Sequence, residues 1–203
     1  MRKSRIAFVL TSWLVAIGVV AAVALALSSG GTPGPRVSSL PGVSAVNAPA
    51  SDGSAARFAF LARQTSNSCG LQPSALAGVP SGMRLQGSCC FPMNLGAYKS
   101  QVRGLRAYAT ISQIPRDPYD VPVSLAKRLF AYDRAVRLSP GQARTYSQGM
   151  RMSRLKGPCC CRCWRWYAFR GLSKHLIADL GWRPKRIAAL VDLLEGCGGP
   201  TNA

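Results

Sequence analysis

The sequence predicts an all-α domain with long loops. Apolar residues recur at intervals of three and four over residues 95–109 and again over residues 125–136, and this spacing is typical of helices that place one face on a core. No segment shows the strict apolar and polar alternation that marks a half-buried strand. Pro115, Pro118 and Pro122 require a loop between the two helices, because proline cannot continue a helix.

Two more helices are predicted nearer the end of the chain. Ser139 is a favoured N-cap residue and Pro140 suits the first helical position, so a helix should begin there and reach about Met152. A last helix should follow Pro184, with an apolar face made of Ile187, Leu190, Val191 and Leu194.

The first 27 residues read as a membrane anchor. Arg2, Lys3 and Arg5 precede an uncharged run over residues 6–27, which is long enough to cross a bilayer as a helix. The basic residues should stay in the cytoplasm and the rest of the chain should lie outside. Ala24 and Ala26 resemble a signal-peptide cleavage site, but secretory apolar cores usually hold about 7–15 residues. The length therefore favours an uncleaved single-pass anchor.

A composition change follows the apolar run. Residues 28–56 are rich in Ser, Gly, Pro and Ala and lack periodicity, which is typical of a flexible linker that cannot bury a core. Residues 57–203 then suffice for one cysteine-rich helical domain outside the cytoplasm, and they are too few for two domains of usual size.

Basic residues far outnumber acidic ones. The chain has 26 Lys and Arg against 7 Asp and Glu, for a net charge of +19, and such a surface attracts anions. Outside the cell the expected partners are anionic lipid headgroups or acidic cell-wall polymers, and nucleic acid would lead only for a cytoplasmic domain. The competing interpretation is a solvated basic surface that reflects composition alone.

Half of the eight cysteines fall within residues 159–163. Pro158 indicates a helix that opens with this run and extends to about residue 180. The positive end of that helix would favour thiolates, the form that binds metal. On a helix, Cys159, Cys160 and Cys163 share one arc, whereas Cys161 points toward the apolar stripe and is expected to be structural.

These three sulfurs leave a tetrahedral ion one ligand short. Cys89 or Cys90, an adjacent pair elsewhere in the chain, can supply it. The sequence thus predicts a soft-metal site made of Cys89, Cys90, Cys159, Cys160 and Cys163. Zn²⁺ would use four of these ligands, whereas Cu(I) needs two or three thiolates.

Two other thiol chemistries compete with metal binding. Eight cysteines in an extracytoplasmic chain can form four disulfides, which would make the domain a stapled binding module. Cys160 and Cys163 also have the spacing of thiol-disulfide oxidoreductases, although the strand that normally precedes that motif is not predicted. A hydrolase is not expected, because the single histidine, His175, and the single glutamate, Glu195, form no known catalytic pattern.

The run Pro158-Cys159-Cys160-Cys161-Arg162-Cys163 resembles the motif of a family of extracytoplasmic bacterial proteins named for the sequence P-C-Y-C-G-C. The proline and the alternating cysteines match. Cys160 and Arg162 replace the tyrosine and the glycine, and the Gly-His pair associated with the following segment is missing. The resemblance covers six residues and implies a surface-located, cysteine-rich, metal-related protein.

Overall fold

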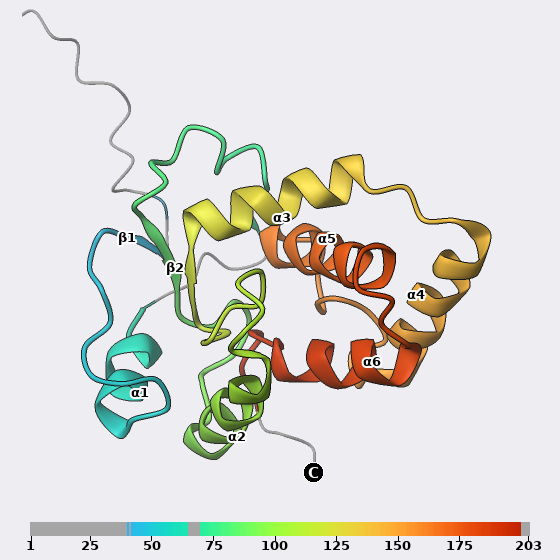
Figure 1. Cartoon of the computed structure of the whole chain (residues 1–203). Helices are drawn as coiled ribbons and strands as arrows, with labels where there is room; N and C mark the ends of the chain where they lie inside the picture. Colours follow the sequence, from blue (N-terminus) through green and yellow to red (C-terminus); the bar gives the residue numbers. More distant parts are fainter. Residues whose placement is uncertain (1–39, 41, 65–69, 200–203) are drawn as a thin grey trace, which may run out of the picture. The chain divides into compact units, whose positions relative to one another are not determined.

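Six α-helices form the main elements of this computed structural model, which describes residues 40, 42–64 and 70–199 (Figure 1). All of them belong to one compact unit that begins at Val37. No helix among the described residues is long and apolar enough to span a membrane. The predicted anchor and its basic flank, residues 1–27, lie outside the described residues.

The centre of the fold is a pair of helices, α3 (Val123–Ala135) and α5 (Trp164–Ala178), which run side by side in Figure 1. A methyl group at Gly171 of α5 would lie 2.0 Å from the backbone oxygen of Leu129 in α3, so this glycine is what lets the two backbones approach. Across the same contact, Arg170 makes two 2.6 Å bonds to the Asp133 carboxylate. The pair therefore combines close packing with a bidentate ion pair.

The other two C-terminal helices pack beside this pair. α4 (Pro140–Met152) begins at Ser139, whose side chain and that of Gln142 form a reciprocal capping box. α6 (Pro184–Leu193) lies against α4 and buries Ile187, Leu190 and Val191. Both helices were predicted from these residues, and their observed bounds confirm the prediction.

The N-terminal part of the unit carries shorter elements. α1 (Ala55–Ala62) and α2 (Leu95–Leu105) pack together around Tyr98 and Val102. The helix predicted over residues 95–109 ends at Leu105 and continues as the 3-10 turn η3 (Arg106–Tyr108). Ala109 follows this turn and is exposed.

The prediction of a purely α-helical domain needs a correction, because a small antiparallel sheet is present. Its strands are β1 (Val43–Ser44), β2 (Arg84–Gln86) and β3 (Asp120–Pro122), in the order β1-β2-β3. Leu85 of β2 pairs with Val43 on one side and with Val121 on the other. Strands of two or three residues are too short to show an alternating pattern, so no such signal was available in the sequence.

Part of the stretch assigned to the flexible linker, residues 28–56, belongs to the folded unit. β1 lies within it, Ala48 is buried, and Ser54 caps α1 by accepting a hydrogen bond from the Arg57 backbone. Short Ser, Gly and Pro-rich segments can be ordered when another element supplies the contacts, and here β2 and Arg57 do so.

Candidate metal centre

The cysteine run does not form the opening turn of a helix, which corrects the sequence prediction. α5 begins at Trp164, and Cys163 is its N-cap with extended backbone angles of φ −86° and ψ −175°. The Trp164 backbone N–H donates to the carbonyl of Leu71 at 2.8 Å instead of to a preceding helical turn. The helix predicted to begin at Pro158 would have bonded the Trp164 N–H to a carbonyl within the cysteine run. The bond to Leu71 takes its place, and residues 159–163 form a loop.

Three segments that are distant in sequence converge at this loop. The segment after β2 brings Cys89 and Cys90, the loop before α5 brings residues 159–163, and the segment after α6 brings Cys197. Backbone bonds tie the first segment to the last: Cys89 N–H donates to Gly196 O at 3.0 Å, and Cys90 N–H donates to Cys197 O at 3.1 Å. The sulfurs are therefore positioned by backbone hydrogen bonds as well as by side-chain packing.

Four of the sulfurs form a buried set, which we call the inner set: Cys89, Cys159, Cys163 and Cys197. Their exposed fractions are 4%, 3%, 0% and 3%. The Sγ atom of Cys159 lies 3.5 Å from that of Cys197 and 4.0 Å from that of Cys163. The ligand atoms of Cys89, Cys159 and Cys197 all lie within 4.8 Å of one another. Cys89, Cys159 and Cys197 thus have the spacing of ligands around one metal ion, and Cys163 adjoins this group through its contact with Cys159.

Three more cysteines form the rim of the site, which we call the outer set: Cys90, Cys160 and Cys161. Cys160 is exposed, and the other two are partly exposed. The Cys160 sulfur lies 3.3 Å from that of Cys90 and 2.9 Å from that of Cys197. The ligand atoms of Cys159, Cys160 and Cys161 also lie within 4.8 Å of one another. No two of the seven described cysteines are joined by a disulfide.

Arg165, in the first turn of α5, is the charged group beside the inner set. It is fully buried at 0% exposure. One guanidinium nitrogen donates to the Pro118 carbonyl and the other to the Gly87 carbonyl at 3.1 Å. A methyl group at Gly196 would lie 2.3 Å from the guanidinium carbon, so the chain that carries Cys197 packs directly on this cation.

No carboxylate among the described residues lies within ion-pair distance of Arg165. Burial opposes its charged form, but the negative charge of the four inner cysteines outweighs this effect and raises the pKa of Arg165. The guanidinium also lies 4.7 Å from the ring centre of Trp164. The sulfurs are therefore its source of negative charge in the described part of the chain.

Hydrogen bonds determine which inner sulfur ionises first. Contacts with the sulfurs of Cys163, Cys197 and Cys89 lower the pKa of the Cys159 thiol. The same contacts raise the pKa values of these three thiols, because one thiolate beside them disfavours a second negative charge. Backbone N–H groups of Cys161 and Arg165 also donate to the sulfurs of Cys159 and Cys163 respectively. Cys159 is thus the first thiolate of the set.

Of the five sulfurs predicted as ligands, four lie in groups with metal-binding spacing: Cys89, Cys90, Cys159 and Cys160. Cys163 is buried and contacts Cys159 at 4.0 Å but lies in none of these groups. Cys161 was expected to be the structural thiol and lies at the partly exposed rim, because the loop does not follow a helical path. Cys69 lies outside the described residues.

Two contributors to the site were not predicted from the sequence. Cys197 joins both sulfur sets, yet its position 34 residues after Cys163 gives no local spacing signal. Arg165 lies between Trp164 and Trp166 and was not assigned to the site from the sequence. An arginine between two tryptophans directly after a cysteine run was the signal for a buried cation.

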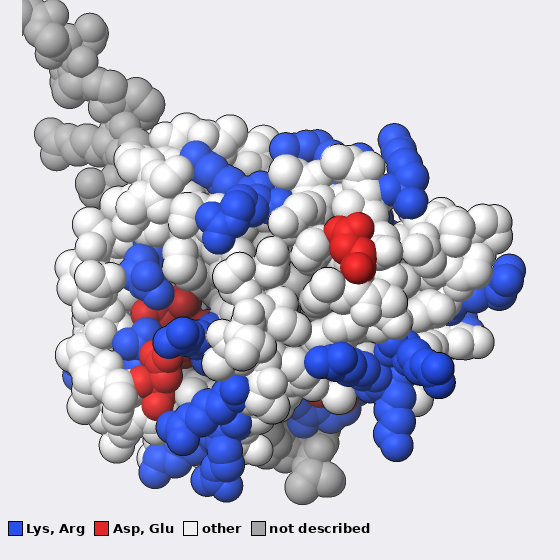
Figure 2. Space-filling model, in the orientation of Figure 1, with Lys and Arg blue, Asp and Glu red and all other residues white. Residues whose placement is uncertain are grey.

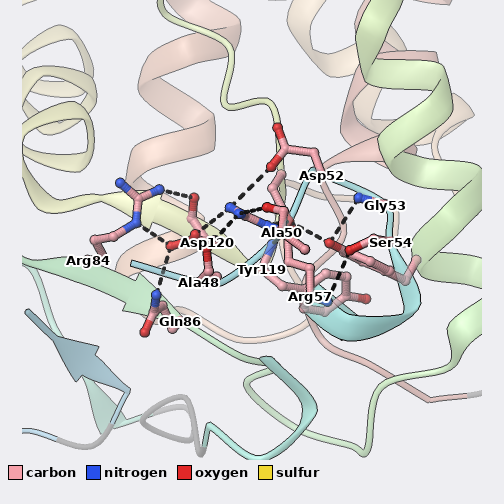
Figure 3. A network of polar contacts seen from close by, with 12 residues as sticks. Ala48, Ala50, Asp52, Gly53, Ser54, Arg57, Arg84, Gln86, Tyr119 and Asp120 are labelled. Atoms are coloured by element: carbon pink, nitrogen blue, oxygen red, sulfur yellow. Dashed lines mark hydrogen bonds and ion pairs between the residues drawn. The ribbon is translucent and has the colours of Figure 1, made fainter. Parts of the chain in front are cut away.

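A second polar cluster lies away from the sulfurs (Figure 3). Arg57 donates to Asp117 at 3.0 Å and to Asp120 at 2.6 Å, and Arg84 donates to Asp120 at 2.5 Å. Burial raises the pKa of Asp117, although Tyr98 and the Tyr119 backbone donate to it. Each carboxylate in this cluster already has an arginine partner, so the cluster serves to join α1 to β2 and β3.

His175 takes no part in the sulfur site. Its ring stacks on Tyr132 with centroids 4.4 Å apart, and its Nδ1 atom is hydrogen-bonded to Asp179 one turn later in α5. The methionines also lie elsewhere: Met83 and Met150 pack in the main core, Met93 packs beside Tyr98, and Met152 is exposed.

Basic side chains are scattered over the visible face, most of which is neither basic nor acidic. Figure 2 shows Lys and Arg at many places over this face and Asp and Glu at few.

Comparison of the chain with models of known protein families, with curated proteins and with solved structures found no match.

Proposed function

We propose that this protein binds a soft metal ion, Zn²⁺ or Cu(I), through the thiolates of the inner set. The observation that carries the proposal is the buried guanidinium of Arg165 beside four buried sulfurs, with no carboxylate partner among the described residues. Several cysteine triads lie within metal-binding distance. The charges of the cysteine sulfurs and of Arg165 favour metal binding over disulfide formation.

The charge of Arg165 distinguishes thiolates from disulfides. A Zn²⁺ ion with four thiolates has a net charge of −2, and a buried cation beside it offsets part of that charge. Disulfides are neutral and would leave the guanidinium with only carbonyl oxygens and aromatic rings. An uncompensated buried charge costs about 3–5 kcal/mol. The buried arginine therefore favours a thiolate centre.

The spacing of three inner sulfurs, Cys89, Cys159 and Cys197, supports one shared ion, and Cys163, in contact with Cys159, is the proposed fourth ligand. Zinc–sulfur bonds of about 2.3 Å in a tetrahedron place neighbouring sulfurs about 3.8 Å apart. The Cys159 sulfur lies 3.5 Å from that of Cys197 and 4.0 Å from that of Cys163. The backbone donors to Cys159 and Cys163 are of the type that orients metal ligands from the second coordination shell. Four sulfurs suit Zn²⁺ better than Cu(I), which prefers two or three.

The proposed location of the domain, outside the cytoplasm, rests on the sequence. The basic flank and the apolar run over residues 6–27 indicate a single-pass anchor with the domain outside the cytoplasm.

A stapled, non-enzymatic binding module with a basic surface is the second candidate function. The 2.9 Å contact between the Cys160 and Cys197 sulfurs favours it, because a small movement would join them in a disulfide.

The experiment that tests the proposal is a metal assay on the chain purified without chelator, in reducing buffer. We expect bound zinc or copper, and we expect Cys163→Ser to lose it because this substitution removes one inner ligand. Cys161→Ser is the matched control: it lies in the same loop outside the inner set and should retain the metal. A chain that holds no metal, with all of its cysteines in disulfides by mass spectrometry, would contradict the proposal and support the stapled module.

A further inference from the structure

Two groups of three sulfurs meet at a single residue. One group is Cys89, Cys159 and Cys197, all buried, and the other is Cys90, Cys160 and Cys197, which reaches the surface. The Cys197 sulfur lies 3.5 Å from Cys159 on the inner side and 2.9 Å from Cys160 on the outer side. Cys197 is therefore placed between two potential ligand sets.

A thiolate has more than one lone pair and can bind two soft ions at once. We propose that the site holds two ions, with Cys197 as the bridging ligand. The inner ion is bound by Cys89, Cys159, Cys163 and Cys197, and the outer ion by Cys90, Cys160 and Cys197. This inference rests on the proposed function, because it adds a second ion to the same thiolate centre.

The ligand count and the charge both fit a bridged pair. Six thiolates and two Zn²⁺ ions have a net charge of −2, the same as one Zn²⁺ with four thiolates. Sharing Cys197 thus adds an ion without adding negative charge near Arg165, the single buried cation that the centre contacts among the described residues. The outer sulfurs must open slightly, since 2.9 Å and 3.3 Å are shorter than the ~3.8 Å of a zinc tetrahedron.

The two ions would differ in their exposure to solvent. The inner ligands are buried, whereas Cys160 is exposed and Cys90 is partly exposed. Three thiolates leave the outer ion a position for water or for a ligand from another molecule, as in metal sites with an open position. The outer ion is therefore the exchangeable one, through which metal would enter or leave the inner set.

Native mass spectrometry of the full chain, loaded with Zn²⁺ in reducing buffer, tests the inference. We expect two ions per chain. Titration with a chelator should remove the outer ion first and the inner ion at a chelator concentration at least tenfold higher. The double variant Cys90→Ser and Cys160→Ser should hold one ion and lose the first step of the titration. Cys161→Ser should still hold two, because Cys161 lies close to Cys159 and Cys160 but belongs to neither proposed ligand set.

The possible outcomes separate this inference from the proposed function. One ion per chain, unaffected by the double substitution, would overturn the bridged pair and leave the inner metal site intact. No ion in any form would overturn both. A disulfide between Cys160 and either Cys90 or Cys197 in the chain isolated without reductant, with one ion still bound, would also overturn the outer site.

Discussion

At the scale of single residues, Arg165 sets the chemistry of the cysteine centre. A fully buried guanidinium has to find negative charge, and its hydrogen bonds to two carbonyls supply only partial charges. In the metal-bound form that we propose, the inner thiolates complete its surroundings, and in return the cation stabilises their ionised form. Arginine suits this role because it stays protonated under all ordinary conditions.

The first prediction concerns this cation. Arg165→Met should weaken metal binding by at least about tenfold, which corresponds to ~1.4 kcal/mol, because the thiolates lose their buried counter-charge. Arg165→Lys retains the charge and should keep most of the affinity. Competition with a chelator of known affinity gives the measurement, with circular dichroism to verify folding.

Arg162→Met is the control for this substitution, since Arg162 is exposed and lies 5.7 Å from the ring centre of Trp166. It should leave the affinity unchanged. An Arg165→Met variant that folds, is more stable than the original chain and binds metal equally well would show that the guanidinium does not balance the thiolates.

Residue chemistry was easier to predict from the sequence than residue positions. The cluster over residues 159–163 and the adjacent pair Cys89 and Cys90 could be identified by composition alone. The role of Cys197 could not, because its approach depends on backbone bonds from Cys89 and Cys90 to residues 196–197. Such contacts between distant segments leave no periodic trace in a single sequence.

At the scale of elements, the contact between α3 and α5 holds the long helices together. Asp133 of α3 receives two bonds from Arg170 and lies 3.2 Å from the Lys174 ammonium, both in α5. Burial opposes the Asp133 carboxylate, but the bonds from Arg170 outweigh burial and lower the pKa of Asp133. Folding therefore stabilises the charged form of this residue.

The second prediction follows from this pKa shift. The folded pKa of Asp133 lies below the unfolded value of about 3.9, so its contribution is complete above that value and is lost as the pH falls through the folded pKa. Asp133→Asn should lower the free energy of unfolding at pH 7 by about 1 kcal/mol, since Arg170 is partly solvated. It should also flatten the loss of stability in acid. Chemical denaturation at a series of pH values measures both effects.

Asp192→Asn is the comparison for this prediction. Asp192 contacts Arg154 at 3.8 Å, and both side chains are more exposed than that of Asp133. Its substitution should change the acid profile less. Equal profiles for the two variants would mean that the α3–α5 ion pair contributes no more than an ordinary surface pair.

The helices differ in how far the sequence determines them. α4 and α6 follow from local signals, namely a capping residue, a proline at the first turn and a regular apolar face. The start of α5 does not, because the Trp164 N–H bonds to Leu71 and leaves the cysteine run as a loop. The three short strands depend on partners up to 42 residues apart, as in the pairing of Val43 with Leu85.

At the scale of the whole molecule, excess positive charge is the dominant property. Exposed Arg183, Lys185 and Arg186 gather at the start of α6, where Arg186 lies 3.8 Å from the ring centre of Trp182. The first turn of this helix has no acidic residue to offset them. Anionic lipid headgroups or acidic wall polymers remain the expected partners outside the cell.

The third prediction is that a fragment from Val37 onward, the start of the folded unit, binds vesicles that contain anionic lipid. Binding should fade as salt rises through the physiological range, because screening shortens the reach of surface charges to about 8 Å. Co-sedimentation at several salt concentrations provides the measurement, and zwitterionic vesicles are the control. If the fragment fails to bind anionic vesicles even at low salt, the arginines reflect composition rather than a partner.

The convergence of three segments on one centre also bears on how the domain reaches its native state. Cys89 and Gly196, which are hydrogen-bonded, are 107 positions apart, so bringing the ligands together closes a long loop. Contacts of such long range form slowly, because the entropy of closing a large loop is lost before any bond compensates it. Until then the thiols stay reactive and unprotected. Metal uptake would accordingly be one of the last steps of folding, and its rate would report on completion of the entire domain.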